Sequence, residues 1–272
     1  YIVPLALMFT AHFYIGYMVG IFTFFYFCWY CLSREGRILP KKFFSRCVAF
    51  GIGTLVALMC AAFVLITVYN SLKLEFTDPD FSLATQFDFL TFITKLFPMS
   101  YDTVYPEGMP MIYCGTAVLI LVPLFFMNDR ITMKEKTSTG LLTFLLVILM
   151  YIKPADMAMH GFQVPNWLPY RYSFIFSFLM IVMAFKAFEN LEGITAKNIG
   201  GIFFGLMVFL FWCERENYSH FQLFETKTSE TGDTTNVIQG IWVSMIALAA
   251  YFALIYLIKK YPKSKAVCIV MV

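Results

Sequence analysis

The chain has 272 residues, of which 60% are hydrophobic and 19% aromatic, while only 14% are charged. Soluble domains are typically about 45–50% apolar, so this composition excludes an ordinary water-soluble enzyme and indicates a helical membrane protein. The net charge of +3 is uninformative as a total, but the positions of the charges along the chain are not.

Seven apolar stretches are separated by polar or charged segments. Spanning the apolar layer takes about 20 helical residues, because each residue advances about 1.5 Å through about 30 Å. The first stretch is long enough to be either one span or two half-depth helices, and the fourth is short. We predict an all-α, polytopic bundle in a single transmembrane domain, with approximate spans at 1–32, 47–69, 110–127, 139–152, 172–188, 199–213 and 237–258.

The charges between these stretches alternate in sign. Lys and Arg near span ends are retained on the cytoplasmic side. Of the 20 basic residues, 14 lie in loops that we therefore predict to face inward: 33–46, 128–138, 186–198 and 259–265. Of the 17 acidic residues, 12 lie in loops that we predict to face outward: 70–109, 153–171 and 214–236. The outer loops hold the unusual residues, and the first is long enough to carry short interfacial helices.

The first stretch contains a polar and aromatic segment, Thr10–Met18, around His12. A histidine at membrane depth is a functional candidate. A histidine that caps a helix break would give the same pattern, and we favour that structural interpretation.

The first outer loop ends in a strip, 95–110, that holds three prolines and a glycine. Such a strip is rigid and non-helical. Carboxylates and an aromatic face suit sugar hydroxyls, and the strip carries them at Tyr101, Asp102 and Glu107. Alternatively, Asp102 caps a turn and Glu107 is solvated.

The second outer loop ends with Pro165 and Pro169, which prevent helix formation until Tyr170. Arg171 is then a fixed cation at the start of a helix, where the helix dipole prefers an anion. A bound phosphate or carboxylate would relieve this mismatch. Alternatively, the segment is an interfacial aromatic belt in which Arg171 extends to lipid phosphates.

His160 lies in the same loop, near Asp156 and Arg171 in sequence. It could bind an anion or move a proton. An interfacial histidine that donates to a backbone carbonyl is an equally good interpretation.

The sequence has no glycine-rich phosphate loop, no paired-cysteine zinc pattern and no His-Glu-x-x-His motif. We therefore expect no cofactor, no metal and no nucleic-acid partner. Ion-coupled transport is also disfavoured, because charged residues do not line the middle of several spans. Tyr1 begins inside apolar sequence and a new apolar run follows Lys265, so we expect a piece of a longer protein.

Several motifs in order resemble the bacterial YfhO-type membrane protein family. They are HFYIGYM at 12–18, KLFPMSYDTV at 95–104, EGMPMIYCG at 107–115, PLFF at 123–126 and NWLPYRYSF at 166–174. The family commonly has asparagine at the position of His12 and glycine at the position of Met99. The likeness runs through most of the chain.

This family resembles polyprenyl-dependent glycosyltransferases of the GT-C architecture and is linked to sugar decoration of teichoic acids outside Gram-positive cells. The resemblance implies a multi-pass protein of the bacterial cell membrane. It also implies a lipid-phosphate donor, such as undecaprenyl-phosphate N-acetylglucosamine, and a glycopolymer acceptor in the cell envelope. The usual catalytic acid or base of such enzymes lies in an outer loop that we expect upstream of Tyr1.

We therefore assign binding roles only and leave the catalytic residue unknown. Arg171 and His160 are candidates for the donor phosphate, and Asp102 and Glu107 for the sugar hydroxyls. Candidates for stacking or boundary placement are Tyr101, Trp167, Tyr170 and Tyr172. The competing hypotheses are a transporter or flippase of a lipid-linked sugar, which binds the same cargo without bond formation, and a scaffold.

Overall fold

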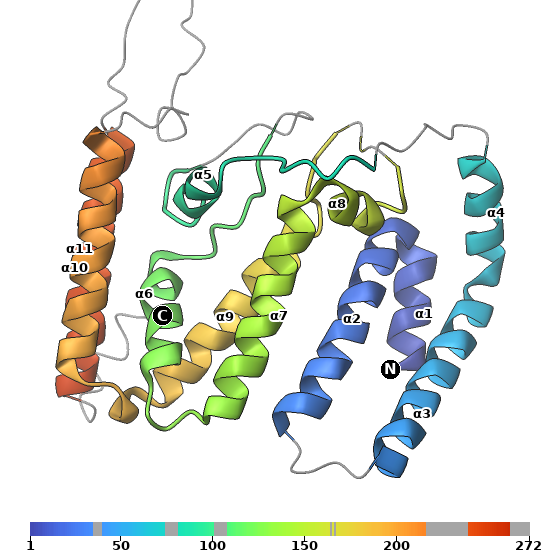
Figure 1. Cartoon of the computed structure of the whole chain (residues 1–272), viewed down its shortest axis with the longest axis horizontal. Helices are drawn as coiled ribbons and strands as arrows, with labels where there is room; N and C mark the ends of the chain where they lie inside the picture. The colour runs from blue at the N-terminus through green and yellow to red at the C-terminus, as the bar shows by residue number, and fades with distance from the viewer. Residues whose placement is uncertain are drawn as a thin grey trace, which may run out of the picture. The chain divides into compact units, whose positions relative to one another are not determined.

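The computed structural model describes residues 1–34, 40–73, 81–100, 108–163, 165, 167–215 and 239–261. Over these residues the protein has eleven α-helices, one short 3₁₀-helix and no named strand (Figure 1). The predicted all-α fold is confirmed. Contacts divide the chain into two compact units: unit 1 is Tyr1–Gln86 with Thr137–Ile175, and unit 2 is Phe87–Lys136 with Phe176–Val272. The prediction of a single transmembrane domain stays a prediction.

Within the described ranges, four helical segments are long and apolar enough to cross a membrane: Phe13–Cys31, Lys42–Cys60, Ala196–Arg215 and Gly240–Lys260. Every predicted span also contains a helix. The fourth stretch, predicted at 139–152, differs in its start, because its helix already begins at Met133. The early start adds Lys134, Glu135 and Lys136, whose charges end a hydropathy run although all three residues favour a helix.

Unit 1 is built from four helices near the N-terminus, most of a long helix and one short helix. They are α1 (Ile2–Ala11), α2 (Phe13–Arg34), α3 (Pro40–Cys60), α4 (Ala62–Leu72), α7 (Met133–Tyr151) and α8 (Lys153–Met159). In Figure 1, α1 and α2 form a hairpin, and α8 lies across the ends of α2 and α7.

His12 separates α1 from α2, so the first predicted stretch forms two helices. Its backbone is extended, with φ −156° and ψ 87°, and its Nδ1 accepts a hydrogen bond from the N–H of Ile15 at 3.3 Å. His12 therefore caps the start of α2, a role for which asparagine is among the best residues. This geometry supports the structural interpretation of His12 and gives a reason for asparagine at the same position in the family.

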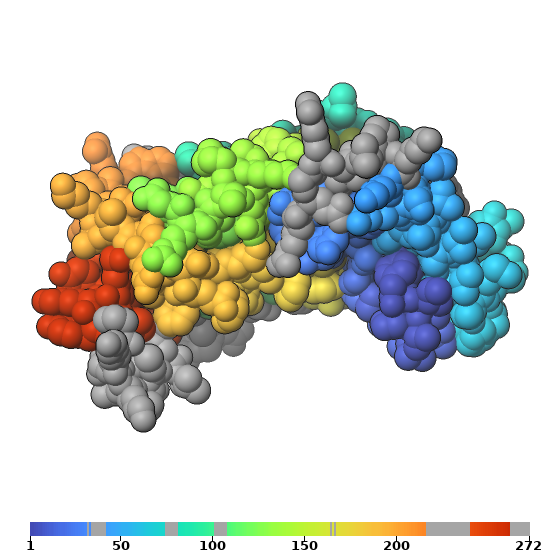
Figure 2. Space-filling model, turned by 90° about the horizontal axis from the view of Figure 1, so that it is seen from below, coloured from blue at the N-terminus to red at the C-terminus, as the bar shows by residue number. Residues whose placement is uncertain are grey.

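Small residues let α1 pack closely against its neighbours. A Cβ on Gly16 would lie 3.1 Å from the Cα of Phe9, so α2 closely approaches the α1 backbone there. Leu5 and Phe9 of α1 form a core with Ala57 and Ala61, at the junction of α3 and α4. The space-filling view shows α1, in dark blue, against these helices (Figure 2). Close approach at small side chains is typical of helix packing in membranes.

Unit 2 contains α5 (Phe89–Thr94), α6 (Thr116–Met127), most of α9 (Ser173–Glu189), η1 (Leu191–Gly193), α10 (Ala196–Arg215) and α11 (Gln239–Lys260). Helices α6, α10 and α11 pack together. Between α10 and α11, the rings of Phe203 and Phe252 stack with their centroids 4.3 Å apart. The short helix α5 starts at Asp88, whose carboxylate accepts the N–H of Thr91 at 2.9 Å.

The loop after α6 is fixed to the turn around η1 by a group of polar contacts that we call the Asn128 cluster: Asn128, Asp129, Arg130, Asn190 and Gly193. Asn128 is fully buried, and both ends of its amide are satisfied. Its Nδ2 donates to the Asn190 carbonyl at 2.9 Å, and its Oδ1 accepts the Arg130 N–H at 2.9 Å. The Asp129 N–H donates to the Gly193 carbonyl at 3.0 Å. A Cβ on Gly193 would meet the backbone nitrogen of Arg130 at 2.9 Å, so a side chain at this position does not fit.

Polar contacts within each unit join loops to helices or to each other. In unit 1, the Tyr17 hydroxyl near the start of α2 donates to the Ala158 carbonyl of α8 at 2.8 Å. In unit 2, the Ser244 hydroxyl of α11 donates to the carbonyl of Pro98 at 3.0 Å. At the other end of α11, the Lys259 ammonium donates to the Leu191 carbonyl at 2.8 Å and joins two predicted inner loops. The alternation of inner and outer loops stays a prediction.

Candidate functional site

The candidate site lies in unit 1, where the start of α2 meets α8 and the loop before α9. Its centre is His160, whose side chain is fully buried. The Nδ1 of His160 is hydrogen-bonded to the Tyr14 hydroxyl, and its Nε2 lies 3.4 Å from Asp156 Oδ1, within ion-pair range. Among the described residues Nε2 has no hydrogen-bond partner. The imidazole therefore faces a phenol on one side and a carboxylate on the other.

The end of α8 determines where His160 points. His160 is the C-cap, and Gly161 follows it with φ 67°, a left-handed value that glycine adopts without strain. The N–H of Phe162 donates to the Met157 carbonyl at 2.8 Å, and the N–H of Gly161 donates to the Ala158 carbonyl at 3.4 Å. These two bonds define a Schellman motif. Asp156 lies one turn before His160 on the same helix, so both side chains share a face.

Asp156 is a buried carboxylate with a second partner. The Tyr172 hydroxyl donates to Asp156 Oδ1 at 2.6 Å and also lies 2.7 Å from the Leu149 carbonyl. A buried charge is costly unless it is paired and hydrogen-bonded. Tyr172 and His160 together supply these contacts, which fix the carboxylate against the imidazole.

Arg171 supplies the positive charge of the site. Its guanidinium carbon lies 5.1 Å from the centre of the Tyr14 ring, at a distance typical of a cation–π contact. Its Nη2 donates to the Trp167 carbonyl at 3.0 Å. Its Nε is buried and has no hydrogen-bond partner among the described residues. The guanidinium is thus held in place while part of its donor set is unused.

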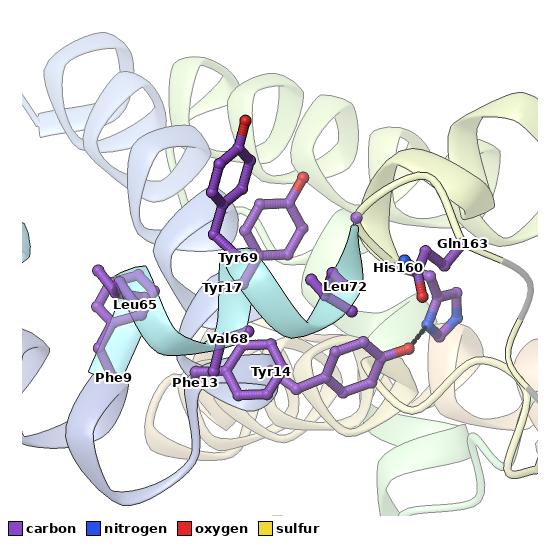
Figure 3. Close-up of a pocket in the computed structure, with 11 residues that line it drawn as sticks. Phe9, Phe13, Tyr14, Tyr17, Leu65, Val68, Tyr69, Leu72, His160 and Gln163 are labelled. Atoms are coloured by element: carbon purple, nitrogen blue, oxygen red, sulfur yellow. Dashed lines mark hydrogen bonds between the residues drawn. The ribbon is translucent and has the colours of Figure 1, made fainter. Parts of the chain in front are cut away.

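A pocket of about 220 Å³ opens beside these groups (Figure 3). Its wall is mostly apolar and aromatic, with side chains from α1, α2 and α4, and its polar end is formed by His160 and Gln163. Figure 3 shows the Tyr14 hydroxyl pointing to the His160 ring at this end. Complete small-molecule sites usually exceed about 300 Å³, so this pocket fits one segment of a larger ligand.

The aromatic residues predicted for stacking differ in their exposure. Trp167 is 54% exposed, whereas Tyr170 and Tyr172 are buried at 5% and 1%. Burial raises the pKa of Tyr170, and the Asp156 carboxylate raises it further, so its phenol is neutral at physiological pH. Trp167 therefore offers a face to a ligand, while Tyr170 and Tyr172 shape the site from inside.

The structure brings together His160, Arg171 and Tyr172 of the predicted site residues. Tyr101, Asp102 and Glu107 lie outside the described residues. Sequence reasoning singled out neither Tyr14 nor Asp156 as a site residue. The signals available were the spacing of Asp156 four residues before His160, and the place of Tyr14 in the motif around His12.

The chain belongs to the family described as "Bacterial membrane protein YfhO", whose profile matches residues 1–272. No curated protein and no solved structure gave a match. The family establishes a membrane protein, and the likeness to the GT-C architecture stays a prediction.

Proposed function

Because the chain belongs to this family of bacterial membrane proteins, we propose that it transfers a sugar from a polyprenyl-phosphate donor to a cell-envelope glycopolymer such as teichoic acid. The transfer takes place on the outer side of the membrane. The observation that carries the proposal is the position of Arg171, which is held against the ring of Tyr14, a residue that lines the largely apolar pocket.

The pocket suits the part of the donor where an apolar chain meets a charged group. Leu65, Val68 and Leu72 of α4 form an aliphatic wall on which the prenyl chain can pack. At the other end, Arg171 can bind the phosphate, because a guanidinium matches the geometry of phosphate oxygens. The pocket volume suits the first part of the prenyl chain, and the rest lies among lipids.

The sugar is expected at the outer rim. The indole of Trp167 is exposed and can cover the apolar face of a sugar ring. Asp102, Glu107 and Tyr101 are proposed to bind its hydroxyls. His160 is enclosed by Tyr14 and Asp156, and a second anion beside that carboxylate would be unfavourable. We therefore assign the phosphate to Arg171 alone.

The outward orientation rests on the distribution of basic residues between the two sets of loops. The loops grouped with the site carry most of the acidic residues, and the positive-inside tendency places them outside. This side of the membrane is where a lipid-linked donor and an envelope polymer can meet.

The proposal is tested with the purified full-length protein in liposomes that contain a labelled polyprenyl-phosphate sugar and a teichoic acid acceptor. Arg171→Gln should lower sugar transfer at least about tenfold, since a charge-assisted contact contributes about 1.5–3 kcal/mol. Arg171→Lys should retain part of the rate, because lysine keeps the charge but lacks the planar donor set. Arg130→Gln makes the same substitution at an exposed ion pair with Glu192 and should retain the rate.

A wild-type rate of sugar transfer in Arg171→Gln, with normal protein levels, would contradict the assignment of the phosphate to Arg171. Movement of labelled donor across the liposome membrane without transfer would favour a flippase instead. Loss of rate in Arg130→Gln equal to that in Arg171→Gln would point to a general effect of lost charge.

A further inference from the structure

Tyr14, His160 and Asp156 form a continuous series of hydroxyl, imidazole and carboxylate. The Tyr14 hydroxyl bonds His160 Nδ1, and His160 Nε2 faces Asp156 Oδ1 at 3.4 Å. In this order of groups, a base oriented by a third residue activates a hydroxyl. Catalytic hydrogen bonds are often long without substrate and shorten in the complex, which fits the distance to Asp156.

The three groups differ in burial, and this difference sets the direction in which a proton can move along the series. The His160 side chain is fully buried and that of Asp156 is 7% exposed, whereas Tyr14 is partly exposed and lines the pocket. A carboxylate beside Nε2 favours a proton on that nitrogen, which leaves Nδ1 free to accept the Tyr14 proton. The Arg171 guanidinium carbon lies 5.1 Å from the centre of the Tyr14 ring, so a cation is held beside the phenol. A proton can thus move from the pocket to His160 through Tyr14.

We propose that Tyr14, His160 and Asp156 are the acid–base unit of the sugar transfer. The inference rests on the proposed function. The acceptor oxygen attacks the anomeric carbon and gives its proton to the Tyr14 oxygen, while the Tyr14 proton moves to His160 Nδ1. The bond from the anomeric carbon to phosphate breaks, and its electron pair leaves with the lipid phosphate. Asp156 stabilises the imidazolium. After product release, Tyr14 gives its proton to solvent water and takes back the proton held by His160.

This proton relay through Tyr14, His160 and Asp156 predicts a rate of sugar transfer that depends on the protonation of the His160 imidazole. In this series only neutral His160 can accept the Tyr14 proton, so transfer should decline at low pH. The titratable groups in contact with His160 are Tyr14 of α2, Asp156 of α8 and Tyr172 before α9. Beyond them, Tyr170 interacts with Asp156, and Arg171 lies over the Tyr14 ring.

A purely structural role is the main alternative, because the Tyr14 hydroxyl also connects α2 to the end of α8. The chain offers a matched control in Tyr17, which also lines the pocket and whose hydroxyl connects the same two helices through the Ala158 carbonyl. Tyr14→Phe and Tyr17→Phe each remove one hydroxyl and one such bond. Only Tyr14→Phe interrupts the path to His160.

The experiment measures kcat and KM for the donor from about pH 5 to 9, with the full-length protein in liposomes. Tyr14→Phe and His160→Gln should lower kcat at least about 100-fold with little change in KM, as expected for loss of acid–base catalysis. His160→Gln should also abolish the decline at low pH. Asp156→Asn should lower kcat, because the imidazolium loses its partner. Tyr17→Phe should keep the wild-type pH profile.

Three results would overturn the relay: wild-type kcat in Tyr14→Phe, an equal loss in Tyr14→Phe and Tyr17→Phe, or an unchanged pH profile in His160→Gln. Each leaves the proposed function intact, since wild-type protein still transfers sugar. Absence of transfer by the wild type would overturn both. Thermal unfolding checks that each variant is folded, and if Tyr14→Phe is not, His160→Gln and Asp156→Asn decide by the same criteria.

Discussion

Met99 has a backbone φ of 64°, which is uncommon for any residue with a side chain. The left-handed region costs such a residue about 1–2 kcal/mol, whereas glycine adopts it freely. The family resemblance places glycine at this position. The glycine is thus explained by backbone geometry, and this chain tolerates the strain of a methionine.

Met99→Gly should therefore stabilise the protein by about 0.5 kcal/mol, the strain relieved minus the larger entropy of glycine in the unfolded chain. Met99 is 38% exposed, so little packing is lost. Thermal unfolding in detergent measures the effect. Met111→Gly is the control, because Met111 is 40% exposed but has no left-handed φ, and it should be destabilising. A lower midpoint in Met99→Gly would contradict the strain argument.

At single residues, the sequence predicted the cation of the site but not its surroundings. Arg171 and His160 could be picked out because the prolines before the helix and the position in an outer loop are local signals. Tyr14 is 146 residues from His160, and no local pattern indicates that contact. Asp156 could be linked to His160 by helical spacing, but Pro154 and the short length of α8 hide that helix in the sequence.

Helix α8 ends where Gly161 adopts its left-handed conformation, and this ending orients His160. A Cβ at Gly161 would meet nothing within 4 Å, so an alanine there costs only backbone strain. Gly161→Ala should destabilise the protein by about 1 kcal/mol. Gly51 also has open space for a Cβ but lies inside α3, so Gly51→Ala should stabilise by up to about 1 kcal/mol. Thermal midpoints that shift in the same direction would contradict this account.

At the level of helices, hydropathy located the apolar stretches but not their boundaries. The α1–α2 break depends on a histidine cap, for which a sequence offers only candidates. Helix α7 extends six residues before its predicted stretch, and its start is capped by the Thr132 hydroxyl, which accepts the Glu135 N–H at 3.3 Å. Glu135 also pairs with Lys186 of α9, a partner that is distant in sequence. Charges that end an apolar run therefore need not end a helix.

For the whole molecule, the orientation in the membrane can be tested directly. In a cysteine-free background, Ser82→Cys and Thr132→Cys place single thiols at exposed positions in a predicted outer and a predicted inner loop. A membrane-impermeant maleimide should label the thiol at position 82 on intact cells and the thiol at position 132 only after permeabilisation, as the basic inner loops predict. The reverse pattern would place the candidate site in the cytoplasm and exclude transfer to an envelope polymer.

The Asn128 cluster limits how unit 2 can change shape. It ties the end of α6 to the turn after α9, while Lys259 ties the end of α11 to the same turn. The ion pair between Glu135 and Lys186 connects the first turn of α7 to α9 at the same end. The bonds of Asn128 and Lys259 end on backbone carbonyls, and the Glu135–Lys186 pair is partly exposed. Conformational motion in unit 2 would therefore pivot about this end, and helix separation would begin at the opposite one, where Ser244 contacts Pro98.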